Sequence, residues 1–478
     1  MKKVVVVYDD TVEVKGRIKS ILGKKSFGEM ILKRRSMSDR IKDALKLCEC
    51  SPTLFVVKTD CYDDVFKGAN DAVFIHVMSN MAIVSPDEFA VCIDKAPYVN
   101  SVSLLSNKGK KFGAIFPNKD AYKTFLDDYA EQKTMAFLKG DVIDSNIFID
   151  LSDYDELLMY ISGGFDARYF NSLQGDNYTV TKRSTDKAKM EAEYKYYWLL
   201  PEHMRSFMVM PYDFRDEGDT ACYTMERMPM TDIAIRWTHG AVDDEELRHI
   251  LDKTFYFFND RERKEVSRSQ YEKMANKLYV DKLKDRIKKL KALKEYEAIE
   301  PMIKSGTQYD SIDAIAEDYF AEYKKVMSKL LKKRHLQSVI GHGDVFFANM
   351  LYSKEANILR LIDPKGATKE EDLWTDPYYD IAKLSHSICG NYDFFNTGSY
   401  DIFLDKDMQY DLNIHTDNTG AKAIFREFLK KNDIDYVTIR IFEASLFLSM
   451  LPLHIDNPHK VFGFILNAIN ILEEVKNV

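Results

Sequence analysis

The sequence predicts an α/β domain followed by a larger α+β region that begins strand-rich and becomes helical. Three changes of pattern along the 478 residues support this order. Strand-length apolar runs alternate with helical spacing over residues 1–143, hairpin-like segments follow over 144–230, and residues 231–478 are largely helical and charged. A chain of this length exceeds one ordinary hydrophobic core, so two or three domains are expected.

The first region alternates between strand and helix patterns. Val4–Tyr8, Leu54–Val57 and Ala72–His76 are short apolar runs with strand length and composition. Helical spacing over Ser38–Cys48, and again over Asp120–Ala130, predicts two helices. This alternation favours a partly parallel sheet with helices packed on it.

The middle region favours antiparallel strands around one helix. A glycine-containing turn at Ile161–Gly164 is expected to join two strand-like runs. The helix pattern covers Asp186–Leu199. The other strands are expected at Tyr178–Lys182, Met208–Tyr212 and Ala221–Met225.

Composition and charge exclude several classes of protein. A net charge of -8 argues against a nucleic-acid binder, which normally carries a basic excess. The six cysteines are scattered without a C-x-x-C pair, as expected of free thiols in a reducing cytoplasm. The apolar run at the N-terminus is too short for a signal peptide or a membrane span, and the apolar segment Ile441–Leu453 is interrupted by Glu443 and Pro452. We therefore expect a cytoplasmic protein without stable membrane insertion.

The strongest chemical signal lies in His342–Asn349 and the following Leu361–Asp363. Phosphoryl transfer depends on positioning and charge neutralisation. Asp344 can accept or orient a hydroxyl proton, while Asn349 and Asp363 offer the hard oxygen ligands that Mg²⁺ prefers. The 13 residues between Asn349 and Asp363 fit a hairpin that returns Asp363 to the first loop. The alternative, in which Asp344 and Asn349 only cap loops, is disfavoured by the combination of these elements.

This segment resembles the Brenner motif of aminoglycoside phosphotransferases and choline kinases, their version of the protein-kinase catalytic loop. Asp363 is similar to the metal-binding aspartate of the protein-kinase Asp-Phe-Gly motif, although Pro364 follows it here. Asp376–Ala382 resembles the family's Asp-Pro-x-x-Asp-Leu-Ala helix start, in which Asp380 would brace the catalytic loop. The resemblance covers about residues 144–478 and implies a two-lobed protein-kinase-like fold that binds ATP and Mg²⁺.

The strand-rich part would be the N-terminal lobe of that fold, over residues 144–230. The turn formed by Ser162, Gly163 and Gly164 is similar to the family's phosphate-covering loop, in which glycines let backbone N–H groups approach phosphates. A plain hairpin turn is the common alternative. Lys182 matches the lysine that pairs with the α- and β-phosphates, and a surface lysine on a strand is its alternative.

The resemblance also implies an ion-pair partner for Lys182 and an adenine-binding hinge. Glu193 on the following helix is the better candidate for the partner, and Glu191 is the fallback. Glu226 and Met228 lie in the segment that would read the adenine edge. The helical lobe, residues 231–478, would hold the acceptor in a subdomain near Ser445–Asp456, where His454 is more simply explained as a core histidine.

The N-terminal domain, residues 1–143, weakly resembles a nucleotidyltransferase-type, Rossmann-like domain. It lacks the glycine-rich, arginine-containing loop that those enzymes carry after their first strand, and Tyr8–Thr11 stands there instead. The segment is not a complete Asp-x-Asp-x-Thr phosphatase motif either. We therefore expect a non-catalytic role in scaffolding or recognition.

Together these patterns predict a small-molecule kinase that transfers the γ-phosphoryl group of ATP, or alternatively GTP, to a hydroxyl group of an amino alcohol, sugar or related metabolite. One alternative is a nucleotide-binding pseudokinase or regulatory module. Another is a bifunctional kinase–nucleotidyltransferase. The sequence leaves the identity of the acceptor and the oligomeric state open.

Overall fold

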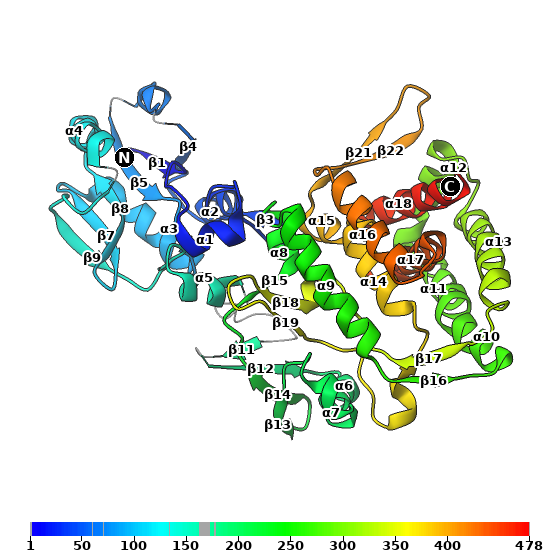
Figure 1. The fold of residues 1–478 in the computed structure, drawn as a ribbon. Helices are drawn as coiled ribbons and strands as arrows, with labels where there is room; N and C mark the ends of the chain where they lie inside the picture. Colours follow the sequence, from blue (N-terminus) through cyan, green and yellow to red (C-terminus); the bar gives the residue numbers. More distant parts are fainter. Residues whose placement is uncertain are drawn as a thin grey trace. The chain divides into compact units, whose positions relative to one another are not determined.

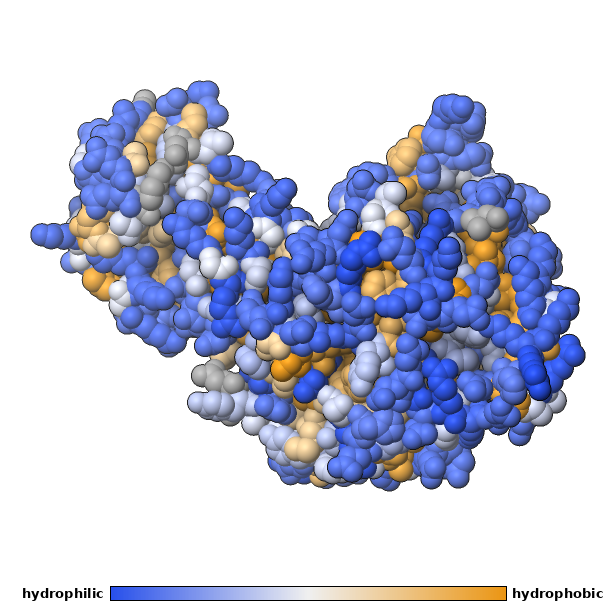
Figure 2. Space-filling model, viewed as in Figure 1, coloured by the Kyte–Doolittle hydropathy of each residue, from blue (hydrophilic) through white to orange (hydrophobic). Residues whose placement is uncertain are grey.

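The computed structural model describes residues 2–59, 61–69, 71–132, 134–161, 178–477 and the backbone of 173–175 (Figure 1). The chain forms two compact units. The N-terminal unit comprises Met1–Ala167 with His239–Ala241, and the C-terminal unit comprises Arg168–Thr238 and Val242–Val478. The face drawn in Figure 2 is mostly hydrophilic, and hydrophobic residues show on it only in separate small patches.

The N-terminal unit is built on a six-stranded mixed sheet in the order β4-β1-β5-β8-β7-β9. β1 is parallel to both β4 and β5, β8 is antiparallel to β5 and β7, and β9 is parallel to β7. The sheet is therefore partly parallel, as the alternating pattern predicts. Its strands are β1 (Lys3–Asp9), β4 (Thr53–Val57), β5 (Ala72–Met78), β7 (Ser103–Asn107), β8 (Lys110–Phe116) and β9 (Asp141–Asp144).

Both faces of this sheet are buried, which explains why β1 is a continuous apolar run. Val6 and its even-numbered neighbours pack with Ile41 on one face, while Val5 and Val7 pack with Tyr122 on the other. Helices α2 (Met37–Leu45) and α3 (Pro86–Lys95) pack on the first face and α4 (Lys119–Gln132) packs on the second, while α1 (Gly16–Leu22) follows β1 in the chain. The helix α2 begins slightly earlier than expected, because Ser36 caps it by accepting a hydrogen bond from Asp39 N at 3.0 Å.

The first unit continues past the change of pattern near residue 144. β10 (Phe148–Asp150) pairs with β6 (Met81–Ile83), and α5 (Tyr154–Ile161) buries Leu157 and Tyr160. The expectation of a strand just before Ile161 is wrong, since α5 is a helix. Asp153 explains why this segment forms a helix, because its side chain accepts hydrogen bonds from the first backbone N–H groups of α5.

The C-terminal unit begins with a four-stranded antiparallel sheet in the order β11-β12-β14-β13. The helix α6 (Lys187–Leu199) packs on this sheet and is capped by Asp186, as its sequence pattern predicts. The strand expected from Met208 begins only at Pro211, after the short helix α7 (Glu202–Arg205). The strands are β11 (Leu173–Gly175), β12 (Thr179–Ser184), β13 (Pro211–Asp216) and β14 (Ala221–Glu226).

The rest of this unit is mainly helical, and α17 lies at its centre in contact with α11, α13, α14 and α18. Its helices are α8 (Ile233–Thr238), α9 (Asp244–Asp260), α10 (Arg268–Asn276), α11 (Lys282–Lys291), α12 (Glu300–Gly306), α13 (Ile312–Leu330), α14 (Tyr379–Ile388), α15 (Tyr392–Thr397), α16 (Thr419–Lys431), α17 (Tyr436–Met450) and α18 (Pro458–Lys476). Its strands are β15 (Thr231–Asp232), β16 (Arg263–Glu265), β17 (Gln337–Ile340), β18 (Met350–Ser353), β19 (Ile358–Leu361), β20 (Trp374–Thr375), β21 (Tyr400–Leu404) and β22 (Tyr410–Ile414).

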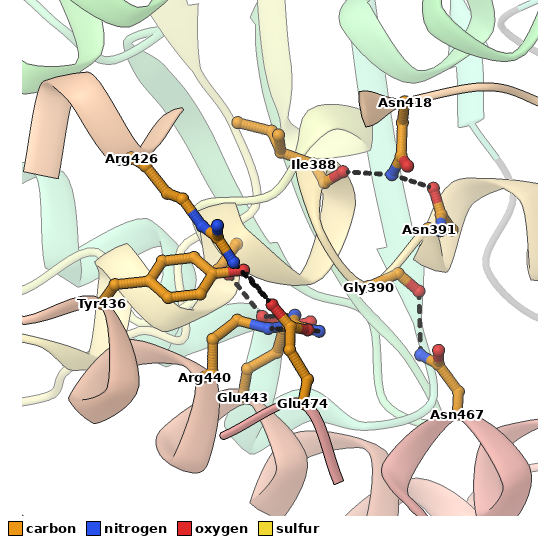
Figure 3. A network of polar contacts seen from close by, with 11 residues as sticks. Ile388, Gly390, Asn391, Asn418, Arg426, Tyr436, Arg440, Glu443, Asn467 and Glu474 are labelled. Atoms are coloured by element: carbon orange, nitrogen blue, oxygen red, sulfur yellow. Dashed lines mark hydrogen bonds and ion pairs between the residues drawn. The ribbon is translucent and has the colours of Figure 1, made fainter. Parts of the chain in front are cut away.

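Buried polar contacts tie the last helices together (Figure 3). Arg440 on α17 pairs with Glu443 at 2.5 Å and with Glu474 on α18 at 2.9 Å, and Tyr436 donates to Glu474 at 2.6 Å. The segment Tyr436–Leu453 has the length and hydropathy of a membrane span, but 78% of it is buried inside the unit. It is therefore a core helix of this unit.

Candidate functional site

The loop that follows β17 is held by its own backbone contacts to α14. The carboxylate of Asp380, near the start of α14, accepts hydrogen bonds from Gly343 N at 2.7 Å and from His342 N at 3.0 Å. Arg261 pairs with the same carboxylate at 3.1 Å, and both side chains are buried. Asp380 thus occupies the bracing position that the sequence motif implies.

Gly343 has a conformational reason to be glycine. Its φ is +82°, and a Cβ atom there would lie 2.6 Å from Cβ of Lys365. The backbone N–H of Lys365 donates to the carbonyl oxygen of His342 at 2.9 Å. A side chain at position 343 would therefore separate the two loops that carry Asp344 and Asp363.

Both carboxylate oxygens of Asp344 have defined partners. Asn349 Nδ2 donates to Oδ2 at 3.0 Å, and Lys383 Nζ on α14 lies 2.8 Å from Oδ1. The Asp344 side chain is still 32% exposed, so a small molecule from solvent can reach it. Asn349 Nδ2 also donates to the backbone carbonyl of Asp344 at 3.0 Å, which fixes the spacing of the two side chains.

The expected hairpin between Asn349 and Asp363 is present. β18 and β19 pair antiparallel, and the Ile362 N–H donates to the carbonyl oxygen of Asn349 at 3.0 Å. Asp363 follows with φ +55°, the left-handed region that residues other than glycine rarely adopt. Such strain persists only where surrounding contacts hold it, and it clusters at functional sites.

Asp363 is held in this conformation by contacts on the strand-rich side of the unit. Lys182 Nζ lies 2.9 Å from Asp363 Oδ1 and 2.7 Å from Glu193 Oε2. Three residues after Asp363, Gly366 has φ +88° and packs so closely against α6 that a Cβ would lie 2.7 Å from the backbone of Ala192. The loop therefore depends on α6, the helix that supplies Glu193.

The ammonium group of Lys182 is buried and compensated. Burial by itself would lower the pKa of Lys182, but the carboxylates of Asp363 and Glu193 raise it above its usual value. The hydroxyl of Tyr223 on β14 donates to Glu193 Oε2 at 2.9 Å. Lys182 is therefore a fixed positive charge that faces Asp363.

Of the two glutamates considered for Lys182, Glu193 makes the contact. Its side chain is 1% exposed, whereas Glu191 lies on the outer face of α6 and pairs with Lys195 at 2.5 Å. Two residues correspond to about 200° around a helix, so the two side chains point in nearly opposite directions.

The remaining predicted residues lie elsewhere. Ser162, Gly163 and Gly164 are outside the described residues. Glu226 ends β14 opposite Thr179, and the N–H of the next residue donates to the Tyr178 carbonyl oxygen. Met228 is half-buried in the segment that leads into β15. In the described part of the chain, neither Glu226 nor Met228 has a recorded contact with Lys182.

Sequence reasoning missed three residues that complete this site: Lys383, Tyr223 and Arg261. Lys383 had a usable signal, because it stands three residues after Asp380 and so lies on the same face of α14. Tyr223 and Arg261 had none, since each meets its partner only through the tertiary fold.

Two side chains of this site offer oxygen ligands of the kind that Mg²⁺ prefers. Asn349 directs its amide nitrogen to Asp344, which leaves Oδ1 as an acceptor, and Asp363 adds carboxylate oxygens. Within the described residues no group of three or more His, Cys, Asp or Glu side chains could hold a metal ion. Asn349 and Asp363 could therefore hold Mg²⁺ only together with oxygen ligands from outside the protein.

No protein-family model and no curated protein sequence matches this chain. Among solved structures it is similar to a thermostable mutant of aminoglycoside phosphotransferase APH(4)-Ia in its apo form, with a TM-score of 0.36 and 11% identity over 62% of this chain and 87% of that one. A glucosamine kinase gives a TM-score of 0.36 and 10% identity over 67% of this chain and 80% of that one. An APH(4)-Ia variant in ternary complex with ADP and hygromycin B gives a TM-score of 0.36 and 10% identity over 67% of this chain and 97% of that one.

Proposed function

We propose that the C-terminal unit is an ATP- and Mg²⁺-dependent phosphotransferase that moves a γ-phosphoryl group to a hydroxyl group of a small molecule. The observation that supports this most directly is the position of Lys182. Its buried ammonium group bridges Glu193 and Asp363, and a single hairpin joins Asp363 to Asn349, which contacts Asp344. Phosphate binding, metal binding and proton acceptance would thus share one rigid frame.

Each residue then has a distinct role. Lys182 binds the α- and β-phosphates, and Glu193 orients it. Asn349 and Asp363 hold Mg²⁺, which when bound neutralises charge on the phosphates. The Glu226–Met228 segment is the expected contact for adenine, through its backbone groups.

The reaction is an in-line displacement at the γ-phosphorus. The acceptor oxygen forms a bond to phosphorus while the bond from phosphorus to the β,γ-bridging oxygen breaks and ADP leaves. Asp344 accepts or orients the proton that the hydroxyl group loses. Lys182 stabilises the negative charge that grows on the departing diphosphate. The acceptor class we expect is an amino alcohol, a sugar or a related metabolite.

The rival proposal is a nucleotide-binding regulatory module without turnover. The joint presence of Asp344, Asn349 and Asp363 favours an enzyme, because a module that only binds nucleotide has no need of a proton acceptor beside its metal ligands. A bifunctional kinase–nucleotidyltransferase would require catalysis in the N-terminal unit as well, and a product screen that includes CTP and UTP would reveal it.

The deciding experiment is a transfer screen with Mg²⁺-ATP against pooled amino alcohols, sugars, polyols and aminoglycosides. Mass spectrometry would detect an added phosphate, and Asp344→Asn serves as the inactive control. We expect a phosphorylated product that disappears in Asp344→Asn, with a loss of roughly 10²–10⁴-fold for removal of a proton acceptor. ATP that binds tightly while no pool yields a product would favour the regulatory module instead.

A further inference from the structure

Two neighbouring parallel strands of the N-terminal unit end side by side, and the loops that follow them lie at the same edge of the sheet. β1 and β4 are parallel neighbours that end at Asp9 and Val57. The chain leaves β1 toward α1 and α2, and α2 packs on the face of Val4 and Val6. It leaves β4 toward the short helix η1 (Asp63–Phe66), which packs on the opposite face. In open α/β sheets, ligands bind outside the carboxyl ends of the strands, the edge at which β1 and β4 both end.

A cavity lies at this position. Its volume is about 520 Å³, within the range of sites that bind small molecules. The residues after both strand ends line it, together with the end of α1 and the turn that follows. The lining residues are Asp10, Thr11, Val12, Glu13, Val14, Lys19, Gly23, Lys24, Lys25, Ser26, Lys58 and Thr59.

The lining is positively charged although the whole chain carries a net charge of -8. Four lysines face two carboxylates there. In the described part of the chain, Lys19, Lys24 and Lys25 have no recorded ion pair, while Lys58 pairs with Glu29 at 2.7 Å. A surplus of ammonium groups around a hollow of this size attracts an anion.

The two carboxylates of the lining are already engaged. Asp10 accepts hydrogen bonds from Ser26 Oγ at 2.6 Å and from Gly28 N at 2.7 Å, and it is 5% exposed. Glu13 pairs with Lys15 at 2.9 Å, outside the lining. The contacts of Asp10 close the turn that presents Lys24 and Lys25, so this carboxylate has a structural role.

Among the four lysines of the lining, Lys25 is the least exposed. It is half-buried, and burial lowers the pKa of its ammonium group, an effect that Glu29 offsets only in part. A bound phosphate would supply the missing negative charge. Val12 and Val14 give the same hollow an apolar wall for the organic part of a ligand.

We propose that this cavity binds a phosphate-bearing small molecule of nucleotide size, held through its phosphate by Lys25 and Lys58. The site is distinct from the proposed phosphotransfer site and does not depend on it. Nucleotides and sugar phosphates share the required chemistry, an anionic phosphate joined to a ring.

The test measures hydrogen–deuterium exchange of the full-length chain by mass spectrometry, because peptides spanning residues 10–26 and 53–59 report on this cavity alone. The probes are UDP, CDP, ADP, glucose 1-phosphate and pyrophosphate. The variants are Lys25→Gln and Lys58→Gln, and Lys46→Gln is the matched control, an exposed lysine of the same unit that pairs with Asp43 outside the cavity.

We expect at least one probe to slow exchange in both peptides. Lys25→Gln and Lys58→Gln should each lower the affinity for that probe about tenfold, as loss of a charge-assisted hydrogen bond does. Lys46→Gln should leave the affinity unchanged. Protection by nucleotides alone identifies the ligand class as a nucleotide, and protection by glucose 1-phosphate identifies it as a sugar phosphate. The proposal is overturned if no probe at about 5 mM protects these peptides, or if all three variants bind equally. Protection of peptides from the C-terminal unit by ADP would bear only on the proposed kinase.

Discussion

Lys383 Nζ lies 2.8 Å from Oδ1 of Asp344, on the side of the carboxylate opposite the contact with Asn349. Lys383 stands on α14, three residues after Asp380, whose carboxylate holds the backbone of the same loop. One helix therefore fixes both the main chain and the key side chain of this loop. The Lys383 ammonium group is mostly buried. Burial lowers its pKa, but the Asp344 carboxylate raises it by more, so the net pKa lies above the usual value and the group stays charged at neutral pH.

Replacing Lys383 with Met should lower kcat about 10–100-fold and leave the KM for ATP nearly unchanged. The reason is that Asp344 loses the contact that fixes one of its oxygens, and small misplacements of reacting groups carry penalties of this size. Steady-state kinetics with the acceptor found in the transfer screen would measure both constants.

Lys332→Met is the matched control, since Lys332 is an exposed lysine of the same unit, in the turn between α13 and β17. Lys383→Arg, which keeps the positive charge, should recover part of the lost kcat. Equal kinetics for Lys383→Met and Lys332→Met would show that the contact with Asp344 has no role in turnover.

Two glutamates on one helix offer a second matched comparison. Glu193→Gln should lower kcat/KM for ATP by about 10–100-fold, because a charged hydrogen bond to Lys182 is lost. Glu191→Gln should change it little, since Glu191 pairs with Lys195 at the surface. Initial-rate measurements at varied ATP concentration separate the two. A similar loss in both variants would contradict the assignment of Glu193.

Much of the site could be predicted because its signals are local. Asp344 and Asn349 share one loop, and the short hairpin that returns Asp363 is visible as two apolar runs around a polar tip. Glu193 required a choice between positions two residues apart, which helical geometry separates. The contact of Lys383 spans 39 positions of sequence, so only its place three residues after Asp380 on α14 indicated it.

One part of the fold was predicted wrongly because the spacing of its hydrophobic residues does not distinguish a helix from a strand. The apolar run within α5, Leu157–Ile161, is five residues long, a length at which a buried strand and a buried helix look alike. Asp153 contained the distinguishing signal, an N-cap before the run. The order of strands in the N-terminal sheet follows from contacts distant in sequence, which no local pattern encodes.

The buried cluster around Arg440 predicts a large difference between two arginines that share one partner (Figure 3). Arg440→Leu should lower the free energy of unfolding by about 3–5 kcal/mol, because buried carboxylates lose their counter-charge. Arg426 also pairs with Glu474, but it is 49% exposed, so Arg426→Leu should cost less than about 1 kcal/mol. Denaturant unfolding of both variants measures this, and similar losses would contradict it.

A buried carboxyl group on α15 predicts how stability depends on pH. Burial raises the pKa of Asp393 from its usual 3.8 to about 7, and the nearby Ser387 hydroxyl offsets only part of this rise. The nearby carboxylate of Asp232 contributes a smaller further rise. The folded chain therefore binds a proton at Asp393 between about pH 4 and pH 7 where the unfolded chain does not.

Because the folded state binds the extra proton, the free energy of unfolding should fall as pH rises through this window and level off above about pH 7. The contribution of Asp393 is at most roughly 4 kcal/mol, at about 1.4 kcal/mol for each pKa unit. Asp393→Asn cannot ionise, so it should raise the Tm relative to the parent at pH 8 and leave it nearly unchanged at pH 4. Asp407→Asn, an exposed loop position, is the control and should shift neither value. If Asp393→Asn instead lowers the Tm equally at both pH values, the carboxyl group is ionised in the folded chain and contributes to its stability in that form.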